Sequence, residues 1–397
     1  MLTVGVLGAS GFVGNRVVEK FHLEGVARIV PIVRNYAGLA RPSRFALEGR
    51  IADALDLEAL TKALSGCDIV VNAVLGAYYQ IIAQPPILYR AAEAAGVKRI
   101  IHISTASVHG QDPEPGTDET TPLRDDQPVP YNNAKVRAEW QLMDLRRRGR
   151  VELVILRPGI VFGPRDIWVG EIARRLLDGT AYLVDGGRGI CNTAYIDNLV
   201  HAIALSMDAR VDGETFLIGD EETITWAGLY DRVARALPGC APPRILTDPP
   251  LVFEKTPVLQ RLRTHTWWRD TTRLFPEALR EQAHDRLRRL GTMLAAIGQA
   301  RSPARSEWVM ADEDLAPVPL ETASLHRCRY KFPFAKARRM LGYAPIVPLE
   351  DGLNRTIRSQ CFAGYAIDPA VASQSREPAG ADEAVAAPQE TRDRVIV

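Results

Sequence analysis

The 397-residue sequence is poor in cysteine, in net charge and in long apolar runs. Its five cysteines form neither a CxxC pair nor a zinc-ligand pattern, so we expect reduced thiols in a cytoplasmic protein and no metal site. The formal net charge of +1 provides no general attraction to nucleic acid. No apolar run reaches the roughly 18 residues that cross a bilayer, and no basic stretch precedes an apolar one at the start. We therefore expect neither a transmembrane helix nor a secretory signal.

Short apolar runs alternate with helix-like segments from the beginning of the chain. Residues 2–7 (LTVGVL) are typical of a buried parallel strand, and NRVVEKFHLEG has the pattern of a helix that ends at Gly25. The alternation continues to about residue 165, and the segments of about 185–220 extend it. Such alternation forms βαβ units. We predict an α/β fold: a Rossmann-type doubly wound parallel sheet at residues 1–165.

The rest of the chain is more irregular. We predict a smaller C-terminal substrate-binding α/β region at 166–367, with an arginine-rich helical insert at about 255–305 that contains Trp267 and Trp268. Three interpretations of the insert stay open: a substrate lid, a solvated helical hairpin, and a patch that contacts a membrane surface. Residues 368–397 are rich in Ala, Glu, Pro, Gln and Asp, which is typical of a disordered tail.

Three glycines, Gly8, Gly11 and Gly14, lie between the first predicted strand and the first predicted helix. The first permits a tight turn, the second lets the backbone approach a pyrophosphate, and the third lets the helix pack closely on the strand. The helix N-terminus then offers free N–H groups to phosphate. In this position the glycines predict a dinucleotide site, with a ligand-free tight turn as the alternative.

The end of the second predicted strand bears on the choice between NAD and NADP. An acidic residue there would accept a hydrogen bond from the 2′-hydroxyl of NAD, but this chain has Arg34, about 20 residues after Gly14. A guanidinium group can pair with a 2′-phosphate, so we favour NADP over NAD; the alternative is a solvated arginine. Asp53 lies where its carboxylate could accept from the adenine amino group.

A strand end with several hydroxyls and a tyrosine–lysine pair supply candidate reacting groups. Ser104 or Thr105, in HISTASVHG, would lie at the carboxyl edge of the sheet, where ligands bind. Tyr131 and Lys135, in YNNAK, are four residues apart and share a helix face. A nearby ammonium lowers the pKa of a phenol, so Tyr131 could exchange a proton with a carbinol oxygen during hydride transfer.

These motifs together resemble the extended short-chain dehydrogenases/reductases of the NAD-dependent epimerase/dehydratase family. The matching segments are GASGFVG, STASVHG, YNNAK, LRPGIVFGP, YIDNLVHAI and KARRMLGYAPIVPLEDGLNRTI. The resemblance implies Thr105, Tyr131 and Lys135 as the catalytic residues, and a homodimer formed through the helix that carries the tyrosine. The cofactor contacts that we expect are Gly8, Ser10, Gly11, Phe12, Val13, Gly14, Arg34, Asp53, Ala73, Tyr131, Lys135 and Pro158.

Departures from the family pattern argue against dehydratase activity and weaken the expectation of a nucleotide-sugar substrate. The 4,6-dehydratases of the family carry Asp-Glu after the catalytic threonine, whereas this chain has Ala106 and Ser107, which cannot eliminate water. Cys191 replaces an arginine that binds the diphosphate of nucleotide sugars in many members, and Ile160 replaces a common asparagine. His109 replaces a common tyrosine, and we expect it to pack or to line the pocket rather than to bind metal.

Three functions remain open at this stage. The first is an NAD(P)-dependent oxidoreductase that interconverts a hydroxyl and a carbonyl on a small molecule, with Tyr131 as acid/base. The second is a sugar epimerase that holds NAD tightly and returns the hydride to the opposite face. The third is a regulatory protein that binds the cofactor, which the intact set of Thr105, Tyr131 and Lys135 argues against.

Overall fold

Seven parallel strands form the central sheet of the computed structural model, which describes residues 1–237, 239–253 and 317–362. The strand order is β11-β6-β5-β4-β1-β2-β3, and it reverses direction between β1 and β4. Loops that leave adjacent strands in opposite directions open a crevice at the carboxyl edge of such a sheet. The bounds are β1 Thr3–Leu7, β2 Arg28–Val33, β3 Arg50–Ile51, β4 Ile69–Asn72, β5 Arg99–Ile103, β6 Glu152–Pro158 and β11 Glu214–Ile218.

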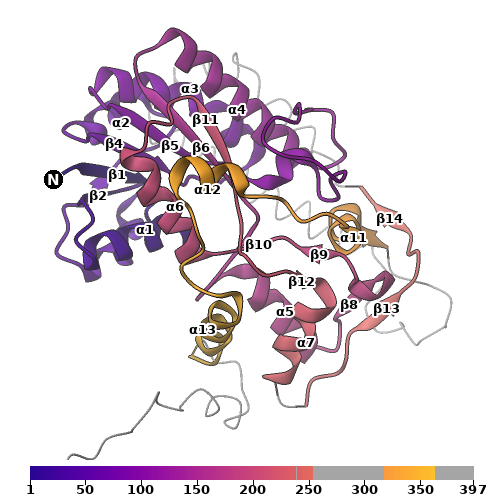
Figure 1. Cartoon of the computed structure of the whole chain (residues 1–397). Helices are drawn as coiled ribbons and strands as arrows, with labels where there is room; N and C mark the ends of the chain where they lie inside the picture. Colours follow the sequence, from indigo (N-terminus) through magenta and orange to yellow (C-terminus); the bar gives the residue numbers. More distant parts are fainter. Residues whose placement is uncertain (238, 254–316, 363–397) are drawn as a thin grey trace, which may run out of the picture.

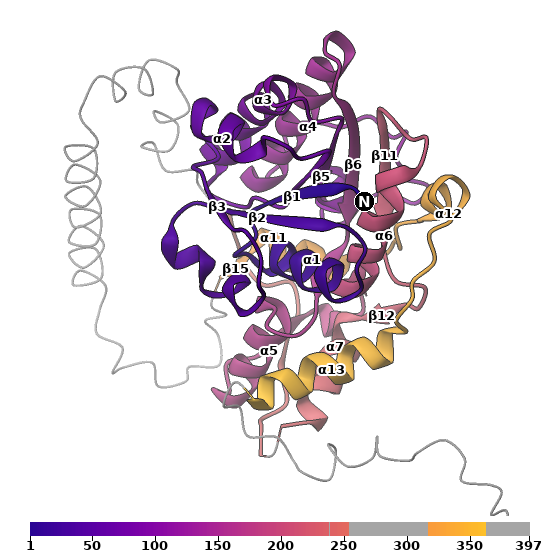
Figure 2. The ribbon, with the colours of Figure 1, turned by 90° about the vertical axis from the view of Figure 1, so that its left-hand side faces the viewer.

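Helices cover both faces of this sheet, as Figure 2 shows. One face packs against α2 (Leu57–Leu64), α3 (Tyr78–Ala94) and α4 (Pro130–Arg148), and the other against α1 (Phe12–Leu23), α6 (Ile196–Asp208) and α12 (Ala335–Leu341). Side chains of a strand alternate between its two faces. In β1, Val4 and Val6 therefore enter the core beneath α1 and α6, whereas Leu7 enters the core beneath α2 and α3. The predicted doubly wound sheet is confirmed.

A second region lies beside the carboxyl edge of the sheet (Figure 1). Its strands form the pairs β10–β7, β12–β9, β13–β8 and β14–β15, and its core contains Trp226, Tyr230 and Leu176. Phe12 and Val13, at the start of α1, pack against this core, so the glycine turn contacts both parts of the molecule.

The elements of the second region are short. Its strands are β7 Ile160–Phe162, β8 Tyr182–Val184, β9 Ile190–Cys191, β10 Thr193–Tyr195, β12 Ile224–Thr225, β13 Arg244–Leu246, β14 Leu251–Val252 and β15 Val318–Pro319. Its helices are α5 Ile167–Leu177, α7 Trp226–Arg235, α11 Leu320–Arg327 and α13 Leu349–Phe362. The insert at 255–305 and the tail at 368–397 lie outside the described residues, and the domain division at residue 165 stays a prediction.

Among the described residues, no helix combines the length and the apolar character that are needed to span a membrane. Four cysteines in this part of the chain, Cys67, Cys191, Cys240 and Cys328, are free thiols.

Candidate active site

The glycine turn after β1 has the geometry that the sequence predicts for a phosphate cradle. Gly8 has φ +85°, a conformation that side chains with a Cβ rarely adopt, and a Cβ there would lie 2.8 Å from the Ala73 carbonyl oxygen. A Cβ on Gly14 would lie 2.3 Å from the carbonyl oxygen of Gly8. Gly11 begins α1 without a side-chain cap, so the N–H groups of the first helical turn are open to a ligand. These residues fit a dinucleotide pyrophosphate.

A cavity of about 710 Å³ extends from this turn to the second region. Its size and position, at the point where the strand order reverses, suit a dinucleotide and a small substrate. Its wall includes Gly8, Ser10, Gly11, Phe12, Val13, Arg34, Asp53, Ala73, Thr105, Tyr131, Lys135 and Pro158. All the predicted site residues except Gly14 thus meet in one cavity, and Gly14 packs beneath the turn instead.

Two exposed arginines lie at or near the end of the cavity where the adenosine of a dinucleotide would bind, and of these Arg34 lines the cavity whereas Arg41 does not. Arg34 follows β2 and lines the cavity, as predicted. Arg41, which the sequence analysis missed, donates from Nη1 to the Ser10 carbonyl oxygen at 3.1 Å and so brings a second guanidinium group to the glycine turn. Asp53 accepts a hydrogen bond from the Leu55 N–H at 2.9 Å, and this bond holds its carboxylate at the rim of the cavity.

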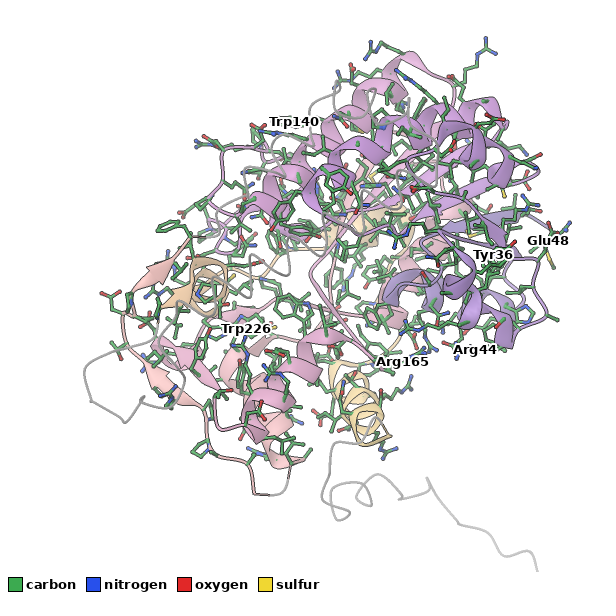
Figure 3. The ribbon with its side chains drawn as sticks, turned by 180° about the vertical axis from the view of Figure 1, so that it is seen from behind. Tyr36, Arg44, Glu48, Trp140, Arg165 and Trp226 are labelled. Atoms are coloured by element: carbon green, nitrogen blue, oxygen red, sulfur yellow. The ribbon has the colours of Figure 1, made fainter. Side chains whose placement is uncertain are left out.

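Two further arginines hydrogen-bond to the same side chain, that of Asn15 in the first turn of α1. Arg44 and Arg165 donate to the Asn15 Oδ1 at 3.5 Å and 3.3 Å. Figure 3 labels both arginines, which come from the two different parts of the molecule. They join the start of α1 to the loop before α5, and neither lines the cavity.

The candidate reacting groups lie at the opposite end, where β5 stops and α4 begins. Thr105 is half-buried, and its Oγ1 accepts from the Ser107 N–H at 3.2 Å, which leaves its own O–H available as a donor. Tyr131 lies in the first turn of α4. Lys135, one turn later, is 3% exposed and donates from Nζ to the Ile103 carbonyl oxygen at 3.1 Å. This bond fixes Lys135 to the last residue of β5, two residues before Thr105.

The pKa of Tyr131 shifts in the direction opposite to the sequence expectation. Burial raises the pKa of Tyr131, and the carboxylate of Glu321 raises it further. Burial also lowers the pKa of Lys135 to about 8, against a smaller raising effect of Glu139. We expected Lys135 to lower the pKa of the Tyr131 phenol. In the protein without cofactor, the loss of hydration on burial has the larger effect and raises that pKa. The phenol therefore stays protonated at neutral pH and can donate a proton.

A buried ionic network supports this catalytic corner. Arg157 and Glu139 form an ion pair at 2.6 Å with side chains 6% and 4% exposed. Ser104 donates its hydroxyl hydrogen to Glu139, and Arg157 also contacts His109 Nε2 at 3.0 Å. Ser104 is thus committed to the network, so of the two candidate hydroxyls at this strand end Thr105 is the one left to donate into the cavity.

His109 packs beside this network, which matches the expectation for it. Its ring lies 5.9 Å from that of Phe332, and burial, with a smaller effect of Arg157, lowers its pKa to about 4. The described ranges contain no group of three His, Cys, Asp or Glu residues that could hold a metal ion.

The substrate side of the cavity is built mostly from residues of the region 166–367, which the sequence analysis assigned to substrate binding without naming the individual wall residues. Gln111 follows the β5 loop, whereas Glu321, Cys328 and Phe332 come from a segment some two hundred residues later. Other wall residues are Ile160, Trp168, Ile190, Asn192 and Leu325. Most are apolar, and apart from Ile160 in the LRPGIVFGP segment no local motif marks them, because their role depends on where the chain returns in three dimensions.

A proton-donating phenol, a lysine and a hydroxyl beside a dinucleotide cradle define the class: an extended short-chain dehydrogenase/reductase. A family model described as "NAD dependent epimerase/dehydratase family" matches residues 4–219, which is more than half of the chain. The chain therefore belongs to this family and is an NAD(P)-dependent enzyme of the oxidoreductase/epimerase type.

The relatives of this chain include both reductases and epimerases. A 3-diazoavenalumate denitrifying reductase from Streptomyces sp is 28% identical over 298 residues, which cover 67% of this chain and 95% of that protein. The N-acetyl-alpha-D-glucosaminyl-diphospho-ditrans,octacis-undecaprenol 4-epimerase of Escherichia coli O157:H7 is 30% identical over 253 residues, 58% of this chain and 71% of that one.

The fold is shared with solved structures at low sequence identity. The UDP-glucose 4-epimerase of Thermotoga maritima, crystallised with UDP-glucose, matches with a TM-score of 0.60 at 19% identity, over 91% of this chain and 99% of that chain. At this identity the likeness concerns the fold alone.

Proposed function

We propose that the protein is an NADP-dependent reductase that converts a carbonyl on a small, largely apolar molecule to a hydroxyl. The observation that carries the proposal is the meeting of Thr105, Tyr131 and Lys135 with the glycine turn in one cavity. When bound, the reduced nicotinamide would supply the hydride that the carbonyl carbon accepts. Thr105 donates a hydrogen bond to the carbonyl oxygen, and Tyr131 transfers its proton to that oxygen. Lys135, held by the Ile103 carbonyl, would bind the nicotinamide ribose and would stabilise the phenolate that remains.

The preference for NADP rests on two arginines rather than one. Arg34 lines the cavity where the second strand ends, and Arg41 contacts the carbonyl of Ser10 at the glycine turn. Two exposed guanidinium groups at this end favour a ribose 2′-phosphate over a 2′-hydroxyl, because charge-assisted hydrogen bonds to phosphate are stronger than neutral ones.

The preference for an apolar carbonyl substrate rests on the described cavity wall. Ile160, Trp168, Leu325 and Phe332 supply apolar surface next to the reacting groups. Cys191, which stands where many nucleotide-sugar enzymes of the family have an arginine, is fully buried and is not among the residues that line the cavity. The Streptomyces relative is also a reductase.

A sugar epimerase is the second candidate, because the Escherichia coli relative and the Thermotoga structure are epimerases. Cofactor balance separates the two reactions. The purified protein is incubated with NADPH and a panel of aryl ketones and β-keto esters, and separately with UDP-glucose and NAD. A reductase oxidises NADPH in proportion to product, whereas an epimerase forms product with no net cofactor change. Binding of NADPH without turnover of any substrate would favour a regulatory protein instead.

We also propose a homodimer in the cytoplasm. Trp140 is 45% exposed on the outer surface of α4, which packs closely against α3 (Figure 3). An exposed tryptophan on a helix pair is typical of a contact surface. The free thiols at Cys67, Cys191, Cys240 and Cys328 suit a reducing compartment. Light scattering of the wild type and of Trp140→Glu tests the dimer: the variant should be monomeric.

A further inference from the structure

Glu321 places a carboxylate in the same cavity as Tyr131. It lies in the first turn of α11, far from Tyr131 in sequence, yet both residues line the cavity wall. The side chain is half-buried, so its charge is only partly screened by solvent. The proposed chemistry of Thr105, Tyr131 and Lys135 makes no use of it.

A buried amide links Glu321 to the start of the catalytic helix. Gln111 Nε2 donates to Glu321 Oε1 at 3.3 Å and to Asn132 Oδ1 at 3.2 Å, and Asn132 Nδ2 donates back to Gln111 Oε1 at 2.8 Å. Gln111 is 7% exposed and Asn132 is 1% exposed. Because Asn132 is the neighbour of Tyr131 on α4, this pair of amides fixes the carboxylate relative to the phenol.

The carboxylate of Glu321 interacts electrostatically with the Tyr131 phenol. This interaction is the second cause, after burial, of the raised pKa of Tyr131. A substrate that accepts the proton of Tyr131 must place its carbonyl oxygen at the phenol. Groups bonded to that carbonyl then lie within the same electrostatic range of Glu321.

We propose that Glu321 is a specificity-determining residue, which selects carbonyl substrates with a cationic or hydrogen-bond-donating group next to the carbonyl and rejects those with an anionic group there. The inference rests on the proposed carbonyl reduction and names its substrate class. An ammonium or hydroxyl can donate to the carboxylate, and donation to a charged acceptor gives the stronger hydrogen bonds. A carboxylate in the same place meets a like charge in a partly desolvated cavity.

Three aryl ketones of similar size test this selectivity. Benzoylformate has a carboxylate next to the carbonyl, methyl benzoylformate has a neutral ester, and α-aminoacetophenone (2-amino-1-phenylethanone) has an ammonium below neutral pH. The kcat/KM of each is measured below neutral pH with NADPH for the wild type and for Glu321→Gln. In the wild type the ammonium ketone should exceed benzoylformate by about tenfold or more, since charges several ångströms apart in such a cavity interact this strongly. Glu321→Gln should reduce that ratio by about tenfold and change the neutral ester by less than about threefold.

Asp112→Asn is the matched control, because Asp112 is an exposed carboxylate in the same part of the surface that does not line this cavity. It should keep the wild-type order of the three ketones. An unchanged order in Glu321→Gln, or an equal change in Asp112→Asn, overturns the inference.

Failure of the inference and failure of the proposed reduction give different results. If Tyr131-dependent reduction of the neutral ester persists while charge selectivity is absent, only the role of Glu321 is wrong. If no ketone is reduced, the proposed function fails for this series, and calorimetric binding of the three probes to the NADP-bound protein decides the role of Glu321. Tighter binding of α-aminoacetophenone than of benzoylformate below neutral pH, lost in Glu321→Gln, supports the inference, and equal or undetectable binding overturns it.

Discussion

Removal of the Arg34 guanidinium should shift the cofactor preference from NADPH toward NADH. Arg34 is exposed at the end of β2 and lines the adenosine end of the cavity, where a 2′-phosphate would lie. A hydrogen bond to a charged group contributes about 1.5–3 kcal/mol, and solvent exposure favours the lower end of that range. Arg34→Ala should therefore lower kcat/KM for NADPH about tenfold, and Arg34→Ala/Arg41→Ala about a hundredfold. The kcat/KM for NADH should change by less than about threefold, because NADH has no 2′-phosphate.

Arg28→Ala is the matched control for this prediction. Arg28 begins the same strand at its opposite end, and its side chain is 66% exposed. The control should leave both kcat/KM values unchanged. The account of the adenosine end is refuted if Arg34→Ala lowers kcat/KM for NADPH and NADH equally, or if it changes neither.

Two further substitutions test the cradle and the catalytic corner. Gly14→Ala puts a Cβ 2.3 Å from the Gly8 carbonyl oxygen, so the turn must move. We expect a loss of about 1–3 kcal/mol in unfolding free energy and weaker NADPH binding. Unchanged NADPH binding, measured by calorimetry, would contradict the role of the turn as a phosphate cradle. Burial lowers the pKa of Lys135 from 10.5 to about 8, so the unfolded chain binds more protons than the folded chain between these pH values. The unfolding free energy of the wild type relative to Lys135→Met should then rise by up to about 3 kcal/mol across that window in urea titrations. If the difference in unfolding free energy between the two proteins does not change with pH, burial does not destabilise the Lys135 ammonium.

The parts of the site that could be predicted are those that short local patterns encode. Gly8 and Gly14 act within a single turn, and their spacing reflects a backbone approach that any side chain would block. Tyr131 and Lys135 are one helical turn apart, so their common direction follows from helix geometry alone. Alternating strands and helices likewise predicted the doubly wound sheet, because burial on both faces leaves a clear apolar pattern.

The substrate wall could not be predicted in the same way. Glu321 and Phe332 reach the cavity only because the chain returns through α11 from more than a hundred residues beyond α6. Arg41 was missed since its contact with Ser10 depends on how the segment after β2 folds back on the glycine turn. The pKa of Tyr131 was misjudged for a related reason: a motif shows which charges are near in sequence but not how deeply the phenol is buried.

The proton donated by Tyr131 is the central claim, and single-turnover reduction of methyl benzoylformate by the NADPH-bound protein tests it most directly. Tyr131→Phe keeps the ring in the cavity wall and removes only the hydroxyl. We predict a rate of hydride transfer at least about a hundredfold lower than in the wild type, with NADPH affinity within about threefold. A variant that transfers hydride at the wild-type rate would contradict the account.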